Sequence, residues 1–487
     1  MKKHFLFAAF AVALMASCTN EENPVVDPII PEVEDKVAID LGVNNPNITA
    51  SRGTGTVGDV ENEITGVSWN NQKLNIVMVD RRTGDYAKED GEKVFDSSLL
   101  DFYAPSAGED NLRIYVKDTY GVSETDKGTV KYKYYPVNGE FDFYGYHIDD
   151  ATGAEETITP GATYAESVAK VTGITINGTQ DILAAKTVEI PSEEPAQTLT
   201  DGSDNPQYVY YQSGLPTETW ADMAAKQFSA RTARNGFTPV LNFEHQLARL
   251  KFYVKSGNPE LGAKYEKQED DTYALRDSAD VTIGTKTYED LATGAIYITN
   301  IVAEKMNNVI DVDLKAQTAT PNGTTVADFA LMSKVADQAA LQELVPVAPT
   351  YPKNASNETG YIESTPIGES MMFLPVENGS AEEIVLSLNL LQVVKDTYNE
   401  VTDETTTFPK ESSSRISLKA ANVDADGDGQ VGDVTAFEAG KSYNVYITIY
   451  SLEEIQITAQ LTAWKDGGDV DLDIENDEYV EDNTTGE

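Results

Sequence analysis

Basic residues are scarce in this chain of 487 residues. Its 36 lysines and arginines stand against 81 aspartates and glutamates, which gives a formal net charge of −45. A field of this sign repels phosphate backbones, so we expect no nucleic-acid partner. The alternative explanation of the charge is colloidal solubility alone.

Residue types that usually carry catalysis are also few. The chain has only three histidines, and "FEHQ" around His245 has no second histidine at helical spacing, so it is no zinc helix. No G-x-S-x-G nucleophile motif is present. We expect no enzymatic activity, and we expect His147 and His245 to lie in strands, with His245 as a satisfied core or rim residue.

The single cysteine, Cys18, excludes an internal disulfide. Before it come a basic "MKKHF", an apolar "LFAAFAVALM" too short to span a bilayer, and a small-residue "ASC". This junction resembles a bacterial lipobox, in which residues 1–17 are removed and the thiol is diacylated. Two acyl chains anchor a protein stably. The alternative is an ordinary secretory signal with a leftover cysteine.

The segment after Cys18 also concerns location. "TNEEN" resembles the signal that exports lipoproteins to the outer face of the outer membrane, and residues 19–36 have the composition of a tether. No later apolar run approaches transmembrane length. We therefore expect membrane contact only through the lipid anchor of a precursor.

Two similar strands are predicted near the ends of the chain. In "KVAIDLGV", four aliphatic residues alternate with smaller or acidic ones, namely Val37, Ile39, Leu41 and Val43. In "DVDLDIE", Val470, Leu472 and Ile474 alternate with acid. Each pattern indicates a strand with one buried face. One groove could accept either strand.

Most of the chain between these ends predicts strands. Tyrosine and β-branched runs such as "KLNIVMVD", "NLRIYVKD" and "GEFDFYGYHI" are separated by Gly, Asn and Asp turns. Helical spacing predicts two helical segments, Pro216–Ala233 and Val326–Val345. We expect a mainly β chain of two tandem β-sandwich domains with short helical insertions.

Three glycines in "ASRGTGTVGD" spell the G-x-G-x-x-G pattern of dinucleotide loops. Such a loop needs a buried strand before it and a helix after it, and the flanking sequences predict neither. The stretch is better explained as a flexible, exposed segment that begins just after Arg52. Exposed extended chain is what proteolysis requires.

A calcium loop is the best metal candidate. Asp424, Asp426 and Asp428 occupy the first, third and fifth positions, Gln430 the seventh, and Asp433 lies near the end. The twelfth position, where a bidentate acid belongs, is Thr435. A structural calcium ion and a solvated Asp/Gly turn both fit this pattern. No other cofactor is expected.

A short motif concerns modification. Asp277, Ser278 and Ala279 resemble an O-glycosylation acceptor used by some anaerobes, although chance also explains three residues.

The order of several segments resembles the fimbrillins, the pilins of type V pili, and the FimA-type major subunits in particular. The segments are the lipobox, the alternating strand, the arginine before a small residue, "YYPVNGEFDFYGYH", "QDILAAK", "LNFEHQLARLKFYV" and "ITIYSLEEIQITAQLTAW". The likeness runs from Cys18 to the tail, and the order of the segments carries it.

The resemblance implies transthyretin-like sandwiches and a mechanism of assembly. An Arg-specific protease would cut after Arg52 and leave Gly53 as the new N-terminus. The strand Val37–Val43 would then leave, and the Val470–Ile474 strand of another subunit would fill its groove. The implied parts are a signal peptide (1–17), a propeptide (18–52), two domains (53–236 and 237–466) and a donor tail (467–487).

The implied product is a structural pilin in an extracellular fimbrium that supports adhesion. Its partners would be further copies of itself, accessory fimbrial subunits, the protease and a host or bacterial surface ligand. One alternative is a tip or accessory fimbrillin that acts as an adhesin. The other is a surface glycan-binding lipoprotein, for which the tyrosine-rich segments would supply an aromatic platform.

Overall fold

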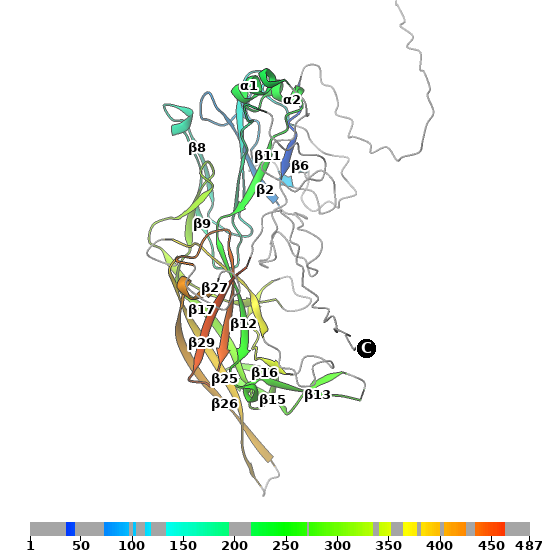
Figure 1. Cartoon of the computed structure of the whole chain (residues 1–487), viewed down its shortest axis with the longest axis vertical. Helices are drawn as coiled ribbons and strands as arrows, with labels where there is room; N and C mark the ends of the chain where they lie inside the picture. Colours follow the sequence, from blue (N-terminus) through cyan, green and yellow to red (C-terminus); the bar gives the residue numbers. More distant parts are fainter. Residues whose placement is uncertain are drawn as a thin grey trace, which may run out of the picture. The chain divides into compact units, whose positions relative to one another are not determined.

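Strands make up almost all of the regular structure (Figure 1). The chain divides into two compact units, Met1–Lys36 and Val37–Glu487, and the second contains every helix and strand described below. The mainly β prediction is confirmed, and the layered sheets are consistent with β-sandwich domains. The computed structural model describes residues 36–43, 73–96, 101–103, 113–117, 133–193, 216–269, 272–334, 340–351, 364–376, 381–399, 404–424 and 434–462.

Seven strands close into a barrel, in the order β1-β11-β10-β7-β2-β5-β6. In chain order they are β1 (Leu41–Val43), β2 (Lys73–Asp80), β5 (Asp101–Tyr103), β6 (Arg113–Lys117), β7 (Phe141–His147), β10 (Leu183–Thr187) and β11 (Val240–His245). All neighbours are antiparallel except β1 and β11, which run parallel.

Strand β2 is apolar at most of its positions because both of its faces are buried. Leu74, Ile76 and Met78 belong to one hydrophobic core, which also contains Leu41 of β1. Val77 on the opposite face belongs to a second core. Because both faces are covered, the alternation expected of a half-exposed strand is largely lost.

Four further strands form a sheet whose members come from distant parts of the sequence. Its order is β19-β18-β9-β8, and β9 pairs antiparallel with β18. Their bounds are β8 (Glu155–Thr159), β9 (Val168–Thr175), β18 (Val309–Asp313) and β19 (Thr318–Pro321).

The remaining larger sheets have five and four strands, in the orders β24-β12-β28-β29-β27 and β20-β17-β25-β26. The first contains β12 (Ala248–Ser256), β24 (Thr365–Phe373), β27 (Val423–Asp424), β28 (Ser442–Ile449) and β29 (Ile455–Thr462). The second contains β17 (Ile296–Asn307), β20 (Val326–Ala330), β25 (Glu383–Asn399) and β26 (Glu404–Lys419).

Small sheets and single turns of 3₁₀ helix complete the described fold. The small sheets are β3 (Lys88–Glu89) with β4 (Glu92–Lys93), β13 (Ala263–Lys267) with β14 (Tyr273–Leu275) and β23 (Thr350–Tyr351), β15 (Ser278–Ile283) with β16 (Lys286–Ala292), and β21 (Met332–Ser333) with β22 (Gln342–Glu343). The 3₁₀ turns are η2 (Tyr164–Glu166), η3 (Pro259–Leu261) and η4 (Ala420–Asn422).

The predicted domain boundary between residues 236 and 237 stays a prediction. Two sheets contain strands from both sides of it, because β11 pairs with β10 and β18 pairs with β9. Backbone hydrogen bonds therefore cross the predicted boundary.

The first predicted helical segment forms as two helices, α1 (Thr217–Lys226) and α2 (Ala230–Arg234). Gln227 separates them with a φ of 45°. Its side chain accepts a hydrogen bond of 3.0 Å from the Ile190 backbone amide. Ser229 and Thr232 form a capping box that starts α2. Trp220 of α1 is fully buried in the barrel core.

The prediction of a helix at Val326–Val345 is wrong. The described part of this segment forms β20, β21 and β22 instead. Ala303 of β17 pairs with Phe329, whose side chain is fully buried, whereas Val326 remains 47% exposed. Pairing with a long neighbouring strand and burial of Phe329 outweigh the intrinsic helical preference of the alanines.

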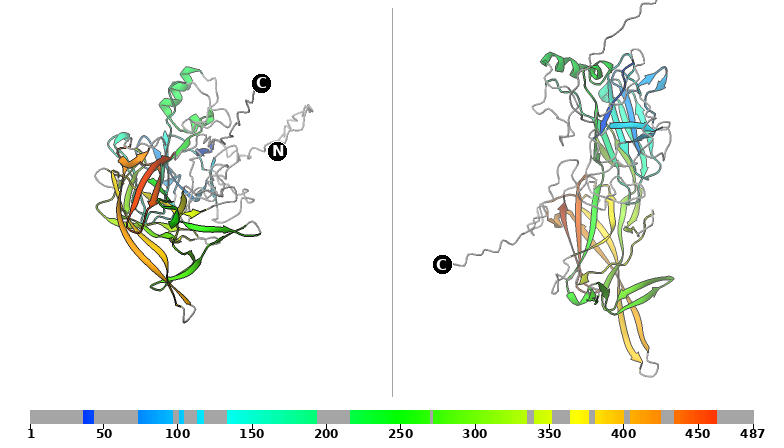
Figure 2. Two further views of the ribbon diagram at one scale, coloured as in Figure 1. Left: turned by 60° about the horizontal axis from the view of Figure 1, so that its bottom comes forward. Right: turned by 90° about the vertical axis from the view of Figure 1, so that its right-hand side faces the viewer.

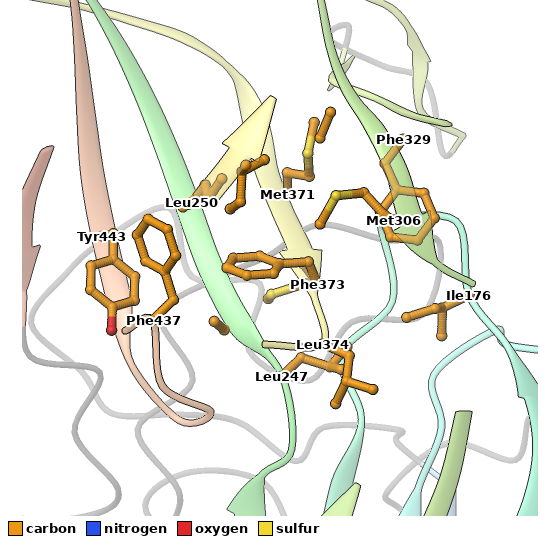
Figure 3. Close-up of a cluster of buried hydrophobic side chains, with 14 of the residues drawn as sticks. Ile176, Leu247, Leu250, Met306, Phe329, Met371, Phe373, Leu374, Phe437 and Tyr443 are labelled. Atoms are coloured by element: carbon orange, nitrogen blue, oxygen red, sulfur yellow. The ribbon is translucent and has the colours of Figure 1, made fainter. Parts of the chain in front are cut away.

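One hydrophobic core joins strands from most of the sheets. In Figure 3, Phe373 of β24 lies between two groups of side chains. Phe437 and Tyr443 lie on one side of it, and Met306 and Phe329 lie on the other. Phe437 meets Phe373 edge-on at a ring distance of 5.7 Å and Tyr443 at 4.9 Å. Edge-to-face pairs of this kind add to the stabilisation from burial.

Within the described ranges, neither α-helix is long and apolar enough to cross a bilayer.

Candidate functional site

The segment Val37–Val43 lies in the barrel as a strand with one buried face, as its alternation predicts. Ile39, Leu41 and Val43 are 8%, 3% and 2% exposed, and Val37 packs against the same core. The ladder assigns only Leu41–Val43 to β1, and Ala38 adds an isolated antiparallel bridge to Tyr134. The strand is therefore short, yet its aliphatic side chains complete the barrel core.

Backbone hydrogen bonds hold this segment on both sides. Its first half pairs with residues 133–135: Ile39 donates to the Lys133 carbonyl at 2.7 Å, and Tyr135 donates to the Val37 carbonyl at 2.9 Å. The second half lies between two strands, because Gly42 is opposite Val240 of β11 and Arg113 of β6. Strand β1 thus closes the barrel between β6 and β11.

The closing strand also meets the start of β11. The Gly42 amide donates a hydrogen bond of 2.9 Å to the Pro239 carbonyl. Val43 lies opposite Leu241, and both side chains belong to the barrel core. Without β1, the inner edges of β6 and β11 would lose their partners, which is costly for backbone groups in a buried setting.

A buried polar cluster lies at the other end of β11. Leu183 of β10 is opposite both His147 and His245, so the two histidines lie on one face of the sheet. His245 Nδ1 is 3.0 Å from Asp181 Oδ2, and both side chains are fully buried. His147 Nδ1 is 3.0 Å from the Lys73 carbonyl. His245 is therefore a buried core histidine whose Nδ1 has a partner, which agrees with the core alternative of the expectation.

One further charged residue, Arg249, lies close enough to this cluster for the charge of Asp181 to act on it. The Arg249 guanidinium donates to Ser442 Oγ at 2.9 Å, and burial lowers the pKa of Arg249 to about 10. Burial also lowers the pKa of His147, because desolvation disfavours the imidazolium. A buried guanidinium requires partners, and the sheet register places Ser442 directly opposite Arg249. The sequence holds no local signal for this cluster, because its members come together only through strand pairing.

Most other predicted site residues lie outside the described residues. They are Cys18, Arg52, Gly53, Asp426, Asp428, Gln430, Asp433, Val470, Leu472 and Ile474. Asp424 ends β27, and Ser278 begins β15 with an exposed side chain. Calcium binding and glycosylation therefore stay predictions. Within the described ranges, no group of three or more His, Cys, Asp or Glu residues is placed to hold a metal ion.

Comparison with known proteins gives structural likenesses only. No family model matches the chain, and no curated protein matches it. Solved structures do match. A proposed cell adhesion protein from Bacteroides uniformis is 11% identical, with 88% of this chain and 98% of that chain covered and a TM-score of 0.39.

Two Porphyromonas gingivalis proteins are also similar to this chain. A fimbrilin (FimA) is 10% identical, with 89% of this chain and 98% of that chain covered and a TM-score of 0.33. The fimbrial anchor protein Mfa2 is 10% identical, with 88% and 98% covered and a TM-score of 0.24. Because these TM-scores are low, we base no conclusion about fold or function on the likenesses.

The polar cluster generates a prediction about pH. The Asp149 carboxyl is buried close enough to this cluster for the charge of Asp181 to act on it. Burial, together with the charges of Asp150 and Asp181, raises the pKa of Asp149 to about 8. The folded chain therefore binds this proton more tightly than the unfolded chain, so stability falls as pH rises from about 4 to about 8. The D149N variant has no carboxyl group at this position, so its stability does not fall with pH for this reason. We expect it to be more stable than the unchanged chain above pH ~8, with the difference shrinking toward pH ~4.

Urea unfolding across this pH range measures the difference. D150N is the comparison variant: it removes one of the charges that raise the pKa of Asp149 and keeps the Asp149 carboxyl, so its pH-dependent gain should be smaller than that of D149N. A stability difference between D149N and the unchanged chain that does not vary with pH would contradict the assignment.

Proposed function

We propose that this chain is a structural subunit of a surface fimbria, assembled by proteolytic removal of the first strand and its replacement by a strand from another copy. The observation that carries the proposal is that β1 closes the barrel between β6 and β11. A strand in this position is both necessary for the core and replaceable by another strand of the same pattern.

The energetics favour replacement over an open barrel. Each of Ile39, Leu41 and Val43 contributes roughly 1.5–3 kcal/mol by burial in the barrel core. Each backbone hydrogen bond contributes about 1 kcal/mol more. An unfilled gap would expose this core and two bare strand edges, which are templates for pairing with another chain.

The proposed cleavage site is Arg52, in the stretch between β1 and β2. Arg81 and Arg82 are the competing sites at the end of β2, and both are held there by carboxylates. Arg81 Nη1 lies 2.9 Å from Asp142, and Arg82 Nη2 lies 2.6 Å from Asp80. Cleavage there would also detach β2, which pairs with β7 near the middle of the barrel sheet. Cleavage after Arg52 detaches β1 alone.

The proposed replacement is Val470–Ile474 of another copy. This segment repeats the period-two aliphatic pattern of the first strand, and it follows β29 in the sequence. Donation of a tail to a groove on the next copy is a head-to-tail interaction, which propagates as a filament.

The remaining steps of the proposal concern location. Cys18 would carry the acyl chains of an outer-membrane precursor, and cleavage after Arg52 would release the chain into an extracellular fimbrium. Accessory fimbrial subunits and an Arg-specific protease would be its partners, and the chain itself would have no catalytic role. A tip position remains the alternative, in which case the tail need not donate a strand.

The first test is proteolysis of the precursor. An Arg-specific protease should cut after Arg52, give a new N-terminus at Gly53, and produce ladders of SDS-resistant oligomers. R52K keeps the charge but removes the recognition residue, so it should remain uncut and monomeric. N-terminal sequencing and SDS gels measure both results. A chain that is cut after Arg52, keeps its C-terminal tail and still remains monomeric would contradict the proposal.

The second test concerns the donated strand. L472D places a charge where the proposal buries an aliphatic side chain, at a cost of about 3 kcal/mol or more, so assembly should fall by at least about 100-fold. The precursor should keep its melting temperature. D471N, on the opposite side of the predicted strand, is the control and should assemble. Normal filaments from L472D would rule out Leu472 as a buried donor residue.

A further inference from the structure

A cavity of about 560 Å³ opens on one face of the β17-β25-β26 sheet. Its floor comes from these three strands, and its walls come from the β15–β16 hairpin and from the β20–β22 segment. Strand β15 contacts β26. In both views of Figure 2, green strands lie beside the long orange strands β25 and β26. The volume lies within the range of small-molecule sites in proteins.

A polar row crosses the floor of this cavity. Asn300 of β17 is opposite Asn389 of β25, and Asn389 is opposite Ser413 of β26. Residues directly opposite one another share a face, so the three side chains line the same surface. All three line the cavity. No hydrogen bond joins their side chains to another described residue, so their amide and hydroxyl groups are available to a ligand.

Apolar side chains underlie and flank this floor, and Tyr288 is the partly exposed one among those named here. Tyr297 and Leu391 are opposite each other on the same face and belong to a small core beneath the β15–β16 hairpin. Tyr288 packs against that core and lines the cavity. Leu331 and Leu344 line the cavity from the other wall. Amide and hydroxyl groups beside an aromatic and aliphatic surface are typical of a site for a small polar molecule.

Charge in this region disfavours an anionic ligand. Among the described residues that line the cavity, Lys286 is the only cationic one, and its Nζ lies 2.7 Å from Glu343 Oε2. Glu411 adds a second carboxylate to the lining. The positive charge is thus compensated locally, and the whole chain carries a formal net charge of −45. An uncharged ligand avoids the repulsion.

A second cavity of about 490 Å³ adjoins the first. The two share Lys286, Tyr288, Glu343 and Leu344, and the second is also lined by Tyr265. A ligand longer than a single ring could therefore occupy both cavities.

We propose that these two cavities form a binding site for a neutral oligosaccharide. Sugar hydroxyls both donate and accept hydrogen bonds, which matches the amides of Asn300 and Asn389. The apolar faces of sugar rings match Tyr288 and its neighbours. The inference goes beyond the proposed assembly, because it concerns the adhesion target and does not depend on strand exchange.

The test uses the full-length, uncleaved chain, so that its outcome is independent of assembly. The probe is an array of neutral oligosaccharides built from glucose, galactose, mannose and N-acetylglucosamine, with heparin fragments as the anionic comparison. We expect binding of neutral probes and none of heparin. The affinity of a bound probe, measured by calorimetry, should fall about tenfold in N389L and Y288A, because each removes one main contact.

Two serines on β26 provide a control that distinguishes an effect on the binding site from a general effect on the sheet. Ser413 lines the first cavity, whereas Ser417 is four residues along the same face of β26, opposite Val385 and outside both cavities. S413A should weaken binding and S417A should not. Thermal melting checks that all four variants remain folded. Absence of neutral-sugar binding, preference for heparin, or equal effects of S413A and S417A would overturn the inference.

Discussion

Closure of the barrel by β1 is the constraint on which the rest of this account depends. Three ladder residues, Leu41–Val43, pair with β6 on one side and β11 on the other. The same short segment supplies aliphatic side chains that the barrel core needs. This short segment therefore contributes both strand pairing on two sides and buried side chains to the barrel core. Under the proposed exchange, removal of this segment would leave the ladders among β11, β10, β7 and β2 in place.

The opposite end of β11 carries buried polar side chains. Asp181 and His245 form a fully buried pair there, and Arg249 follows on β12 after a two-residue connection. Strand β12 lies within the five-stranded sheet, between β24 and β28. Removing one partner of a buried hydrogen-bonded pair is costly, because the other polar group is left buried without its partner. One end of β11 thus adjoins the strand proposed to leave, while the other is tied to a core that should persist through the exchange.

Much of this architecture could be predicted from the sequence, and the limits are physical. Alternation at Val37–Val43 and the aromatic runs predicted strands and buried faces, because those signals are local. Partners and register are not local, so the parallel pairing of β1 with β11 and the row Asn300–Asn389–Ser413 could not be predicted. The prediction of a helix at Val326–Val345 failed for the same reason, since pairing with residues 19 to 28 positions away decided the structure of β20.

The assembled filament offers the most direct measurement. A cryo-EM structure of filaments made from the cleaved chain would show which strand lies between β6 and β11. We predict Val470–Ile474 of a neighbouring copy there, with its aliphatic side chains in the positions of Ile39, Leu41 and Val43. A filament in which residues 37–43 of each chain still close its own barrel would contradict strand exchange.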